Sequence, residues 1–329
     1  MKPAKFDYFA PASVDEALAL LTRYGGEAKI LAGGQSLVPL LNFRLSRPAA
    51  LIDLNRIPSL AYIRAQEGES EPHPTHSRPP TAEAVLAAPV TVKLGAMTRQ
   101  RTIEFSPEIA ERIPLLTEAT RWVGHLPIRS RGTIGGSLAH ADPSAEYPTV
   151  LAALGGSVVA RGPKGERVIA ASELFQSYLT TSLGADEILV EVRLPAPPAG
   201  TGYAFEELAR RHGDFALVGI AAMIARQGDR CVMARLATSG AGPVPLRLRA
   251  AEEILERDGL ADAAIEAAAR RASELVDPDS DIHASADYRR HLAGVLTQRA
   301  VKRALAKATP VVRAAGRRGA GAPPSEASE

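Results

Sequence analysis

The chain has too few cysteines for any structure that depends on sulfur. Cys231 is the single cysteine among 329 residues. One cysteine cannot form an internal disulfide, and an iron–sulfur cluster or a structural zinc site requires several ligands. We therefore expect the chain to carry no metal cluster of its own.

An excess of charge and long apolar runs are missing as well. Thirty-nine lysines and arginines face 37 acidic residues, a net charge of +2, with Arg313, Arg317 and Arg318 in a polar tail. Nucleic-acid binding requires a denser basic face. Apolar stretches such as 217–225 are shorter than the roughly 18 to 20 residues of a membrane span, and the first residues lack a signal-peptide core. We expect a cytoplasmic protein that binds neither nucleic acid nor membrane.

The composition that remains is that of a globular protein with two domains. Hydrophobic residues make up 46% and charged residues 23% of the chain, whose length suggests two units. A change from short α/β segments to longer strands predicts a first domain over 1–178 and a second over 179–308. An aperiodic stretch at about 66–84 is expected to be a mobile insertion, and 309–329 a disordered tail.

The first residues predict a strand–loop–helix–strand unit. Ser13 and Glu16 form a capping box that starts a helix ending at Tyr24. We expect strands over 28–32 and 51–54, with a helix over 37–45 between them. After the insertion a strand over 90–95 and a helix over 109–123 lead to a second Gly-Gly turn. A helical run to residues 155–156 and a hairpin of 157–160 with 167–170 follow.

The second half is predicted to be strands followed by helices. Strand candidates are 187–194, 203–210, 216–225 and 231–238, and helix candidates are 248–257, 261–276 and 286–307. This order is typical of an α+β layer, so the fold class of the whole chain is predicted to be α+β.

Two glycine segments about a hundred residues apart are the strongest feature of the sequence. They are Ala32-Gly33-Gly34-Gln35-Ser36 and Thr133-Ile134-Gly135-Gly136-Ser137. Backbone without a Cβ can approach a phosphate closely, and successive amides in a turn bind anions. Either pair alone is more simply a tight turn. Together they indicate a diphosphate ligand, whereas no pattern predicts a catalytic residue, and His73 and His76 lack a third metal ligand.

These segments also carry a family resemblance. Residues 32–39 and 128–143 closely resemble the FAD-binding medium subunit of molybdenum hydroxylases, the relatives of carbon monoxide dehydrogenase and xanthine dehydrogenase. Further similar segments at 6–8, 213–216 and 280–285 extend the resemblance over most of the chain. It implies a two-lobed FAD-binding domain of the vanillyl-alcohol-oxidase (PCMH) type, followed by a smaller domain of antiparallel strands and helices.

The resemblance also implies which residues hold the cofactor. Two groups would wrap the FAD diphosphate, one from each lobe: Lys29, Ile30, Leu31, Ala32, Gly33, Gly34, Gln35, Ser36 and Leu37, and Thr133, Ile134, Gly135, Gly136 and Ser137. Glu146 would lie near the ribitol or ribose hydroxyls, Leu189 would contact the flavin from the second domain, and Asp214 and Phe215 would lie by the isoalloxazine ring. A core or capping role is the alternative for Glu146, Leu189 and Phe215. Many relatives have lysine where this chain has Glu207, which alters the charge near the flavin.

The function implied is that of an electron-transfer subunit. In such a heterotrimer a large subunit carries molybdopterin, and [2Fe–2S] clusters of a small subunit pass electrons to FAD and on to an external acceptor. A dimer of heterotrimers is expected. The absence of cysteines from the insertion disfavours the hydroxybenzoyl-CoA reductase branch. The alternatives are a free-standing FAD oxidoreductase and a scaffold subunit without flavin, and carbon monoxide, N-heterocycles, purines and aldehydes all stay open as substrates of the complex.

Overall fold

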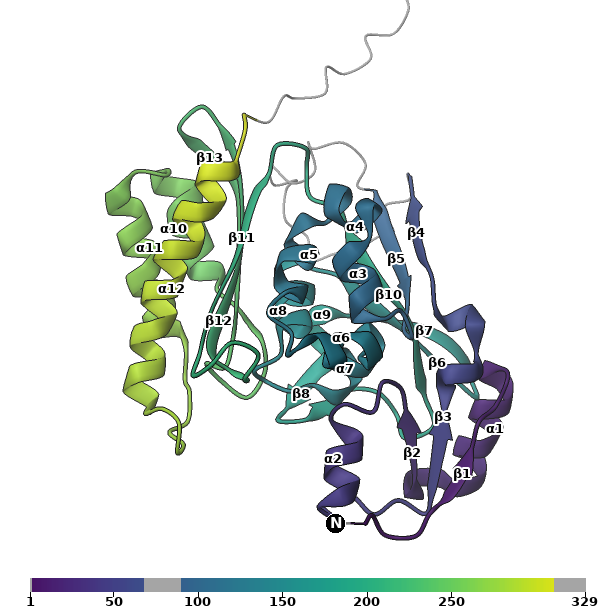
Figure 1. The fold of residues 1–329 in the computed structure, drawn as a ribbon. Helices are drawn as coiled ribbons and strands as arrows, with labels where there is room; N and C mark the ends of the chain where they lie inside the picture. Colours follow the sequence, from purple (N-terminus) through teal and green to yellow (C-terminus); the bar gives the residue numbers. More distant parts are fainter. Residues whose placement is uncertain (1, 68–89, 311–329) are drawn as a thin grey trace, which may run out of the picture.

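The computed structural model describes residues 2–67 and 90–310, which form an N-terminal lobe, a central lobe and a C-terminal domain (Figure 1). The expected mobile insertion and the expected disordered tail lie outside the described residues, except for residues 66, 67, 309 and 310. The predicted α+β class is confirmed, since each lobe or domain combines a sheet with helices.

The N-terminal lobe is a small parallel sheet with two helices. Its strands lie in the order β1-β3-β2, and its elements are β1 (Asp7–Phe9), α1 (Val14–Tyr24), η1 (Gly25–Glu27), β2 (Ala28–Leu31), α2 (Leu37–Asn42), β3 (Ala50–Asp53), η2 (Leu54–Arg56) and η3 (Pro58–Leu60). The predicted strand–loop–helix–strand unit is confirmed. Ser13 caps α1 by accepting from the Glu16 amide at 3.2 Å, while the Glu16 carboxylate accepts from Ala12 rather than from Ser13.

The central lobe is an antiparallel sheet covered by short helices. The sheet order is β4-β5-β10-β6-β7, and the strands are β4 (Ile63–Gln66), β5 (Thr91–Gly95), β6 (Ser157–Gly162), β7 (Gly165–Ala170) and β10 (Ile188–Pro195). The helices are α3 (Gln100–Phe105), α4 (Pro107–Arg112), α5 (Pro114–Thr120), α6 (Leu126–Arg131), α7 (Ile134–His140), α8 (Glu146–Leu154) and α9 (Ala171–Leu174), and β8 (Phe175–Ser177) pairs with β9 (Thr180–Thr181).

Two helix predictions in this lobe were wrong in the same way, because each expected helix is divided into two separate helices in the structure. The helix expected over 109–123 is interrupted before Pro114, which has no N–H to continue the α4 ladder. The helical run expected up to residues 155–156 is divided into α7 and α8, since Ala141 takes a left-handed conformation at φ 54° and ends α7.

The sheet also corrects the assignment of one strand. The sequence placed residues 187–194 in the second domain, which was expected to begin at 179. Instead β10 lies at the centre of the five-stranded sheet, paired antiparallel with both β5 and β6. Hydrogen bonds to one strand about 100 residues upstream and to another about 30 residues upstream decide this membership, and such pairings leave no local signal in the sequence.

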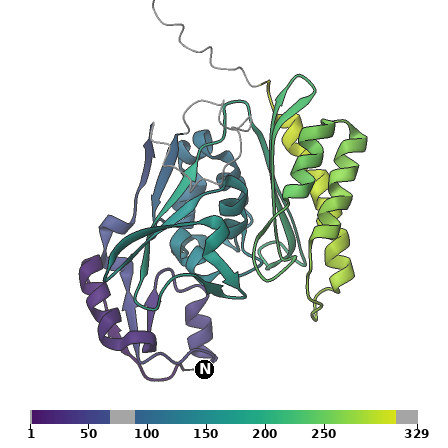
Figure 2. The same ribbon diagram turned by 180° about the vertical axis from the view of Figure 1, so that it is seen from behind.

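The C-terminal domain is an antiparallel sheet with three helices on one face (Figures 1 and 2). Its elements are β11 (Gly202–Ala209), β12 (Ala216–Gln227), β13 (Arg230–Ser239), β14 (Leu246–Arg247), α10 (Arg249–Asp258), α11 (Asp262–Leu275) and α12 (Ala286–Lys307). The other face packs on the central lobe, so that Phe205, Ala221 and Met223 share one hydrophobic core with Tyr147 and Leu151 of α8. Among the described residues, no helix is long and apolar enough to cross a membrane.

Candidate functional site

The two glycine segments meet in the folded chain. A Cβ added to Gly33 would lie 2.5 Å from the Arg131 carbonyl oxygen and 2.7 Å from the Gly132 Cα, and one added to Gly136 would lie 3.3 Å from the Ala32 Cβ. The first segment connects β2 to α2, and the second opens α7. Contact this close between two backbones requires glycine. The fold therefore brings together the two motifs that the sequence singled out.

The first segment presents free backbone donors. The amides of Gly33, Gly34, Gln35 and Ser36 have no acceptor among the described residues, and the segment is half-buried rather than sealed. Gly34 has a φ of +75°, and the Gln35 side chain holds the turn by donating to the Gly33 carbonyl at 3.0 Å. Successive free amides around a left-handed residue form an anion-binding nest. The residues present therefore fit the diphosphate of a dinucleotide such as FAD.

The second segment has the opposite hydrogen bonding. The Gly135 amide donates to the Ala96 carbonyl at 2.9 Å, Ile134 donates to Thr98 at 3.1 Å, and Gly136 donates to the Thr133 hydroxyl at 3.0 Å. Thr133 is the N-cap of α7, so that Gly135 and Gly136 lie in the first turn of a helix. The turn predicted here was wrong because the cap draws both glycines into the helix.

Gly135 is needed for packing. A Cβ at this position would lie 2.5 Å from the Ala96 Cβ and 2.7 Å from the Ala96 carbonyl oxygen. Gly135 is buried, and Ala96 follows directly on β5, the second strand of the central sheet. The second segment thus holds α7 against that sheet and brings the Thr133–Ser137 backbone up to the first segment.

An arginine and an asparagine connect the two segments, and sequence reasoning missed both. The Asn55 amide donates to the Ala32 carbonyl at 2.8 Å, while the Arg99 guanidinium donates to the Asn55 side-chain oxygen and to the Arg131 carbonyl. Burial, and then the charge of Arg131, lower the pKa of Arg99, against the opposite effect of Asp53. Neither residue stood in a motif, so only their position at strand ends could have indicated them.

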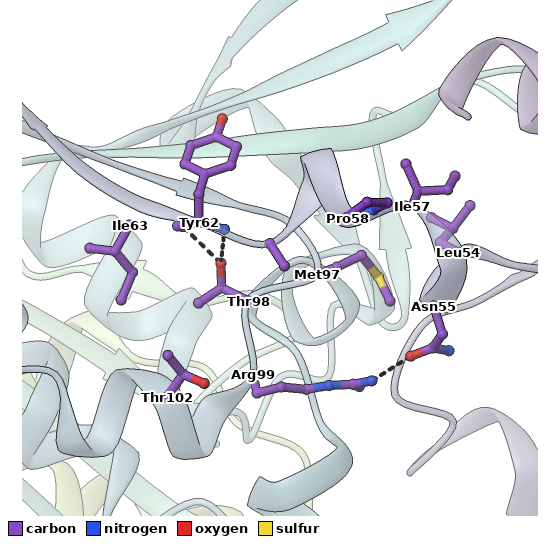
Figure 3. Close-up of a pocket in the computed structure, with 11 residues that line it drawn as sticks. Leu54, Asn55, Ile57, Pro58, Tyr62, Ile63, Met97, Thr98, Arg99 and Thr102 are labelled. Carbon is purple, nitrogen blue, oxygen red and sulfur yellow. Dashed lines mark hydrogen bonds between the residues drawn. The ribbon is translucent and has the colours of Figure 1, made fainter. Parts of the chain in front are cut away.

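A cavity of about 450 Å³ is lined in part by Asn55 and Arg99 (Figure 3). Its lining is mainly apolar and comprises Leu54, Asn55, Ile57, Pro58, Ala61, Tyr62, Ile63, Met97, Thr98, Arg99 and Thr102. The Thr98 hydroxyl is engaged by the Tyr62 backbone, and Arg99 points to Asn55. Because these polar groups bond to one another, the cavity presents few unpaired groups to a ligand.

Leu189, Asp214 and Phe215 lie in different environments. Leu189 is 6% exposed on β10, so it belongs to the core of the central lobe and does not reach the site from the second domain. Asp214 and Phe215 lie in the loop between β11 and β12, and Phe215 is 71% exposed. An exposed phenylalanine in a surface loop is available to a ligand or to a partner chain.

The β11–β12 loop of the C-terminal domain rests on the central lobe. The His212 ring stacks on Trp122 with centroids 5.9 Å apart and an interplanar angle of 16°. Gly213 has a φ of +87°, and a Cβ there would lie 2.3 Å from the His125 ring. Residues 122–125 precede α6, which leads directly to the second glycine segment. The loop carrying Asp214 and Phe215 is therefore held near one end of the site.

Glu146 is the acidic member of the predicted set. It begins α8 and is half-buried. Burial raises the pKa of Glu146 to about 7, and the charge of Asp142 adds to this, whereas its own backbone amide and Arg129 lower it. A carboxyl with such a pKa is partly protonated in neutral solution.

Comparisons with known proteins agree with this architecture. A family model described as the FAD binding domain in molybdopterin dehydrogenase matches residues 4–71 and 83–197, and one described as the CO dehydrogenase flavoprotein C-terminal domain matches 203–304. The first match ends just after β10 and the second begins with β11, so the boundary between the matches agrees with the placement of β10 in the central sheet.

Individual relatives cover nearly the whole chain. It is 43% identical to the 6-hydroxypseudooxynicotine dehydrogenase complex subunit alpha of Paenarthrobacter nicotinovorans, over 94% of this chain and 98% of that protein. The structure of carbon monoxide dehydrogenase from Hydrogenophaga pseudoflava matches with a TM-score of 0.85 and 38% identity, over 94% of this chain and all of that one. Quinoline 2-oxidoreductase from Pseudomonas putida 86 matches with a TM-score of 0.81 and 36% identity, over 92% and 98%.

Proposed function

This chain belongs to the family of FAD-binding medium subunits of the molybdenum hydroxylases, and we propose that it is the electron-transferring flavoprotein subunit of a heterotrimeric complex. The bound FAD would receive electrons from [2Fe–2S] clusters of a small subunit and deliver them to an external acceptor. A large subunit would carry molybdopterin and hydroxylate the substrate. We further propose that two such heterotrimers associate and that the complex is cytoplasmic.

The observation that carries the proposal is the nest of free amides beside the second glycine segment. The amides of residues 33–36 would donate to the FAD diphosphate, with Lys29, Ile30, Leu31, Ala32 and Leu37 shaping that side of the site. Thr133, Ile134, Gly135, Gly136 and Ser137 would form the opposite wall, as the close approach of Gly136 to Ala32 supports. No salt bridge is required for this binding, since neutral amides stabilise the charge.

The remaining predicted residues would contact the other parts of the cofactor. Glu146 would accept from ribose or ribitol hydroxyls, and Asp214 and Phe215 would lie by the isoalloxazine ring. Leu189 would contribute an apolar contact from the central sheet, where it lies in the core. The β11–β12 loop is held in place for this role by the His212–Trp122 stack.

The electron donor must come from another chain. Cys231 is the one cysteine in the sequence, and it is buried, with a pKa that burial raises to about 12. A [2Fe–2S] cluster requires four protein ligands, usually cysteines. The isolated subunit should therefore bind FAD non-covalently, yet lack a route for electrons into it.

Anaerobic absorbance in the flavin's visible band tests this function. The chain alone, loaded with FAD, is mixed with candidate substrates, and the same mixtures are repeated with the large and small subunits present. We expect no bleaching by the chain alone and bleaching by the complex with its substrate. Acid should release the flavin as FAD.

Three results would contradict the proposal. Rapid bleaching of the lone chain by an organic substrate would favour a free-standing FAD oxidoreductase. Failure of chain and complex alike to retain flavin would favour a scaffold subunit. Recovery of FMN in place of FAD would remove the role of the diphosphate site.

A further inference from the structure

A buried carboxyl group without a partner lies between the two domains. The Glu207 side chain on β11 is 7% exposed, and its Oε2 has no hydrogen-bond partner among the described residues. A buried carboxylate without a donor is very costly, whereas the protonated acid costs far less. The position therefore favours a neutral carboxylic acid.

Glu207 faces the central lobe. Side chains alternate along a strand. Phe205 lies in the core shared with the central lobe, and Ala204 lies in the core beneath the C-terminal helices, so Glu207 is on the Phe205 face. In the strand register Glu207 pairs with Gly219, which pairs in turn with Ser239. The Ser239 hydroxyl is also buried, with no partner in the part of the chain that the structure describes, so two such polar groups lie in one row of the sheet.

Glu146 lies at the start of a central-lobe helix that packs against the same sheet. Its helix, α8, packs on β12 and β13. The preceding loop is tied to the end of β13 by a bond of 2.8 Å from the Gly240 amide to the Pro143 carbonyl. Burial raises the pKa of Glu207 to about 9, and the negative charge of Glu146 contributes to this rise. Glu207 therefore lies where the two domains pack together, and the charge of Glu146 disfavours its ionisation.

The positive charge that acts on Glu146 is already paired with another carboxylate. Arg129 of α6 lowers the pKa of Glu146, but Arg129 is ion-paired with Glu104 at 2.9 Å, and Asp142 adds negative charge. Among the charged or titratable side chains on neighbouring elements, Glu118 of α5 is ion-paired with Arg303 and Lys307 of α12, Arg303 is also paired with Glu206, Tyr147 of α8 bonds to Thr120, and Arg235 lies on β13. Glu206 lies on the opposite face of β11, where Arg303 holds it.

We propose that Glu207 is held as a neutral carboxylic acid where the C-terminal domain packs on the central lobe, and that the charge of Glu146 helps to keep it neutral. Ionisation of Glu207 would place a second negative charge in a buried site, loosen the packing of the C-terminal domain on the central lobe and, through repulsion of Glu146, weaken the FAD contact proposed for that residue. The part concerning FAD rests on the proposed function, and the part concerning the domains does not.

The sign of the pH dependence follows from the raised pKa. The folded chain holds the Glu207 proton more tightly than the unfolded chain, whose carboxyl has the ordinary value of 4.5. Stability is therefore fully present below about pH 4.5 and declines as the pH rises to about 9, by about tenfold in the folding equilibrium for each pH unit and proton.

The experiment compares pH profiles of the full chain, stripped of FAD and reloaded. Thermal melting is measured between pH 5 and 10 for wild type, Glu207→Gln, Glu207→Lys and the matched control Glu206→Gln. Between pH 7.5 and 8.5 the stability of wild type and of the control should fall as the pH rises. In Glu207→Gln and Glu207→Lys the slope of stability against pH should be smaller by the amount that corresponds to one proton. FAD affinity of wild type should fall above about pH 9, and that of Glu207→Gln should not.

The outcomes separate this inference from the proposed function. Parallel pH profiles for wild type and Glu207→Gln, offset by a constant amount, would show a merely structural role and overturn the neutral acid. A flattened profile in a chain that never retains FAD would support the neutral acid and contradict the proposed function. A flattened profile with FAD affinity independent of pH would overturn the link to the cofactor.

Discussion

The two glycine segments have nearly the same sequence pattern and opposite roles in the structure. In Gly33 and Gly34 the backbone amides have no acceptor in the described ranges 2–67 and 90–310, and the residues are half-buried. In Gly135 and Gly136 each amide already donates to a group of the protein. A glycine pair thus has two possible uses, which are to expose donors to a ligand or to let two backbones pack closely.

The largest expected effect is the loss of stability on substitution of Gly135, the glycine that is needed for packing. Gly135→Val adds a branched side chain where even a Cβ would lie 2.5 Å from the Ala96 Cβ. Overpacking of this kind costs about 1–3 kcal/mol and occasionally more. We expect urea denaturation to show a fall in the free energy of unfolding of about 3 kcal/mol, with loss of FAD as a consequence.

Gly26→Val is the matched control for this substitution. Gly26 is exposed in η1, and an added Cβ would meet nothing within 4 Å. Exposed substitutions of this kind change stability by about 0.5 kcal/mol or less. An unchanged stability of Gly135→Val would show that α7 can move away from the sheet, and the packing role would be withdrawn.

A smaller effect, confined to the cofactor, is expected at the donor glycine. Gly34 has a φ of +75°, and an added Cβ would meet only the flexible ends of Leu31 and Val38 at 3.2 Å. A left-handed conformation costs an ordinary side chain about 1–2 kcal/mol. Gly34→Val should relieve this strain by leaving the amide-presenting conformation, and FAD titration should show affinity weaker by about 5- to 30-fold.

Gly34→Asn sharpens the same test. Asparagine tolerates positive φ better than valine does, so this variant should keep more of the FAD affinity. Equal losses in the two variants would point to steric blockage by any side chain, and equal retention would remove the amide nest from the site.

The smallest expected effect is a difference in amide hydrogen exchange between the two segments of the unmodified chain. Without FAD, the free amides of residues 33–36 should exchange rapidly, and those of 134–137 should be protected by their hydrogen bonds. Addition of FAD should slow the first group and leave the second nearly unchanged. Slowing of both groups to the same extent would contradict the division of roles.

Much of the local structure could be predicted because its causes are local. The Ser13 cap, the hairpin turn at residues 162–165 and the helix over 286–307 depend on neighbouring residues, and the structure contains all three. The glycine segments and their family resemblance likewise came from contiguous residues. The helix predicted over 109–123 was wrong at Pro114, a local signal that the sequence contains, because proline cannot donate the hydrogen bond that would continue α4.

The sequence by itself determined that two glycine segments exist, that the chain has one cysteine and that its fold is α+β. Only the tertiary structure decided that the acceptors for Ile134 and Gly135 are Thr98 and Ala96, that β10 belongs to the central sheet, and that Glu207 is buried on the central-lobe face of β11 with an Oε2 that has no partner in the described part of the chain. The physical reason is that each of these facts depends on groups tens of residues apart. Hydrogen bonding and burial at such separations are set by the packing of whole elements and not by the neighbours of a residue in the chain.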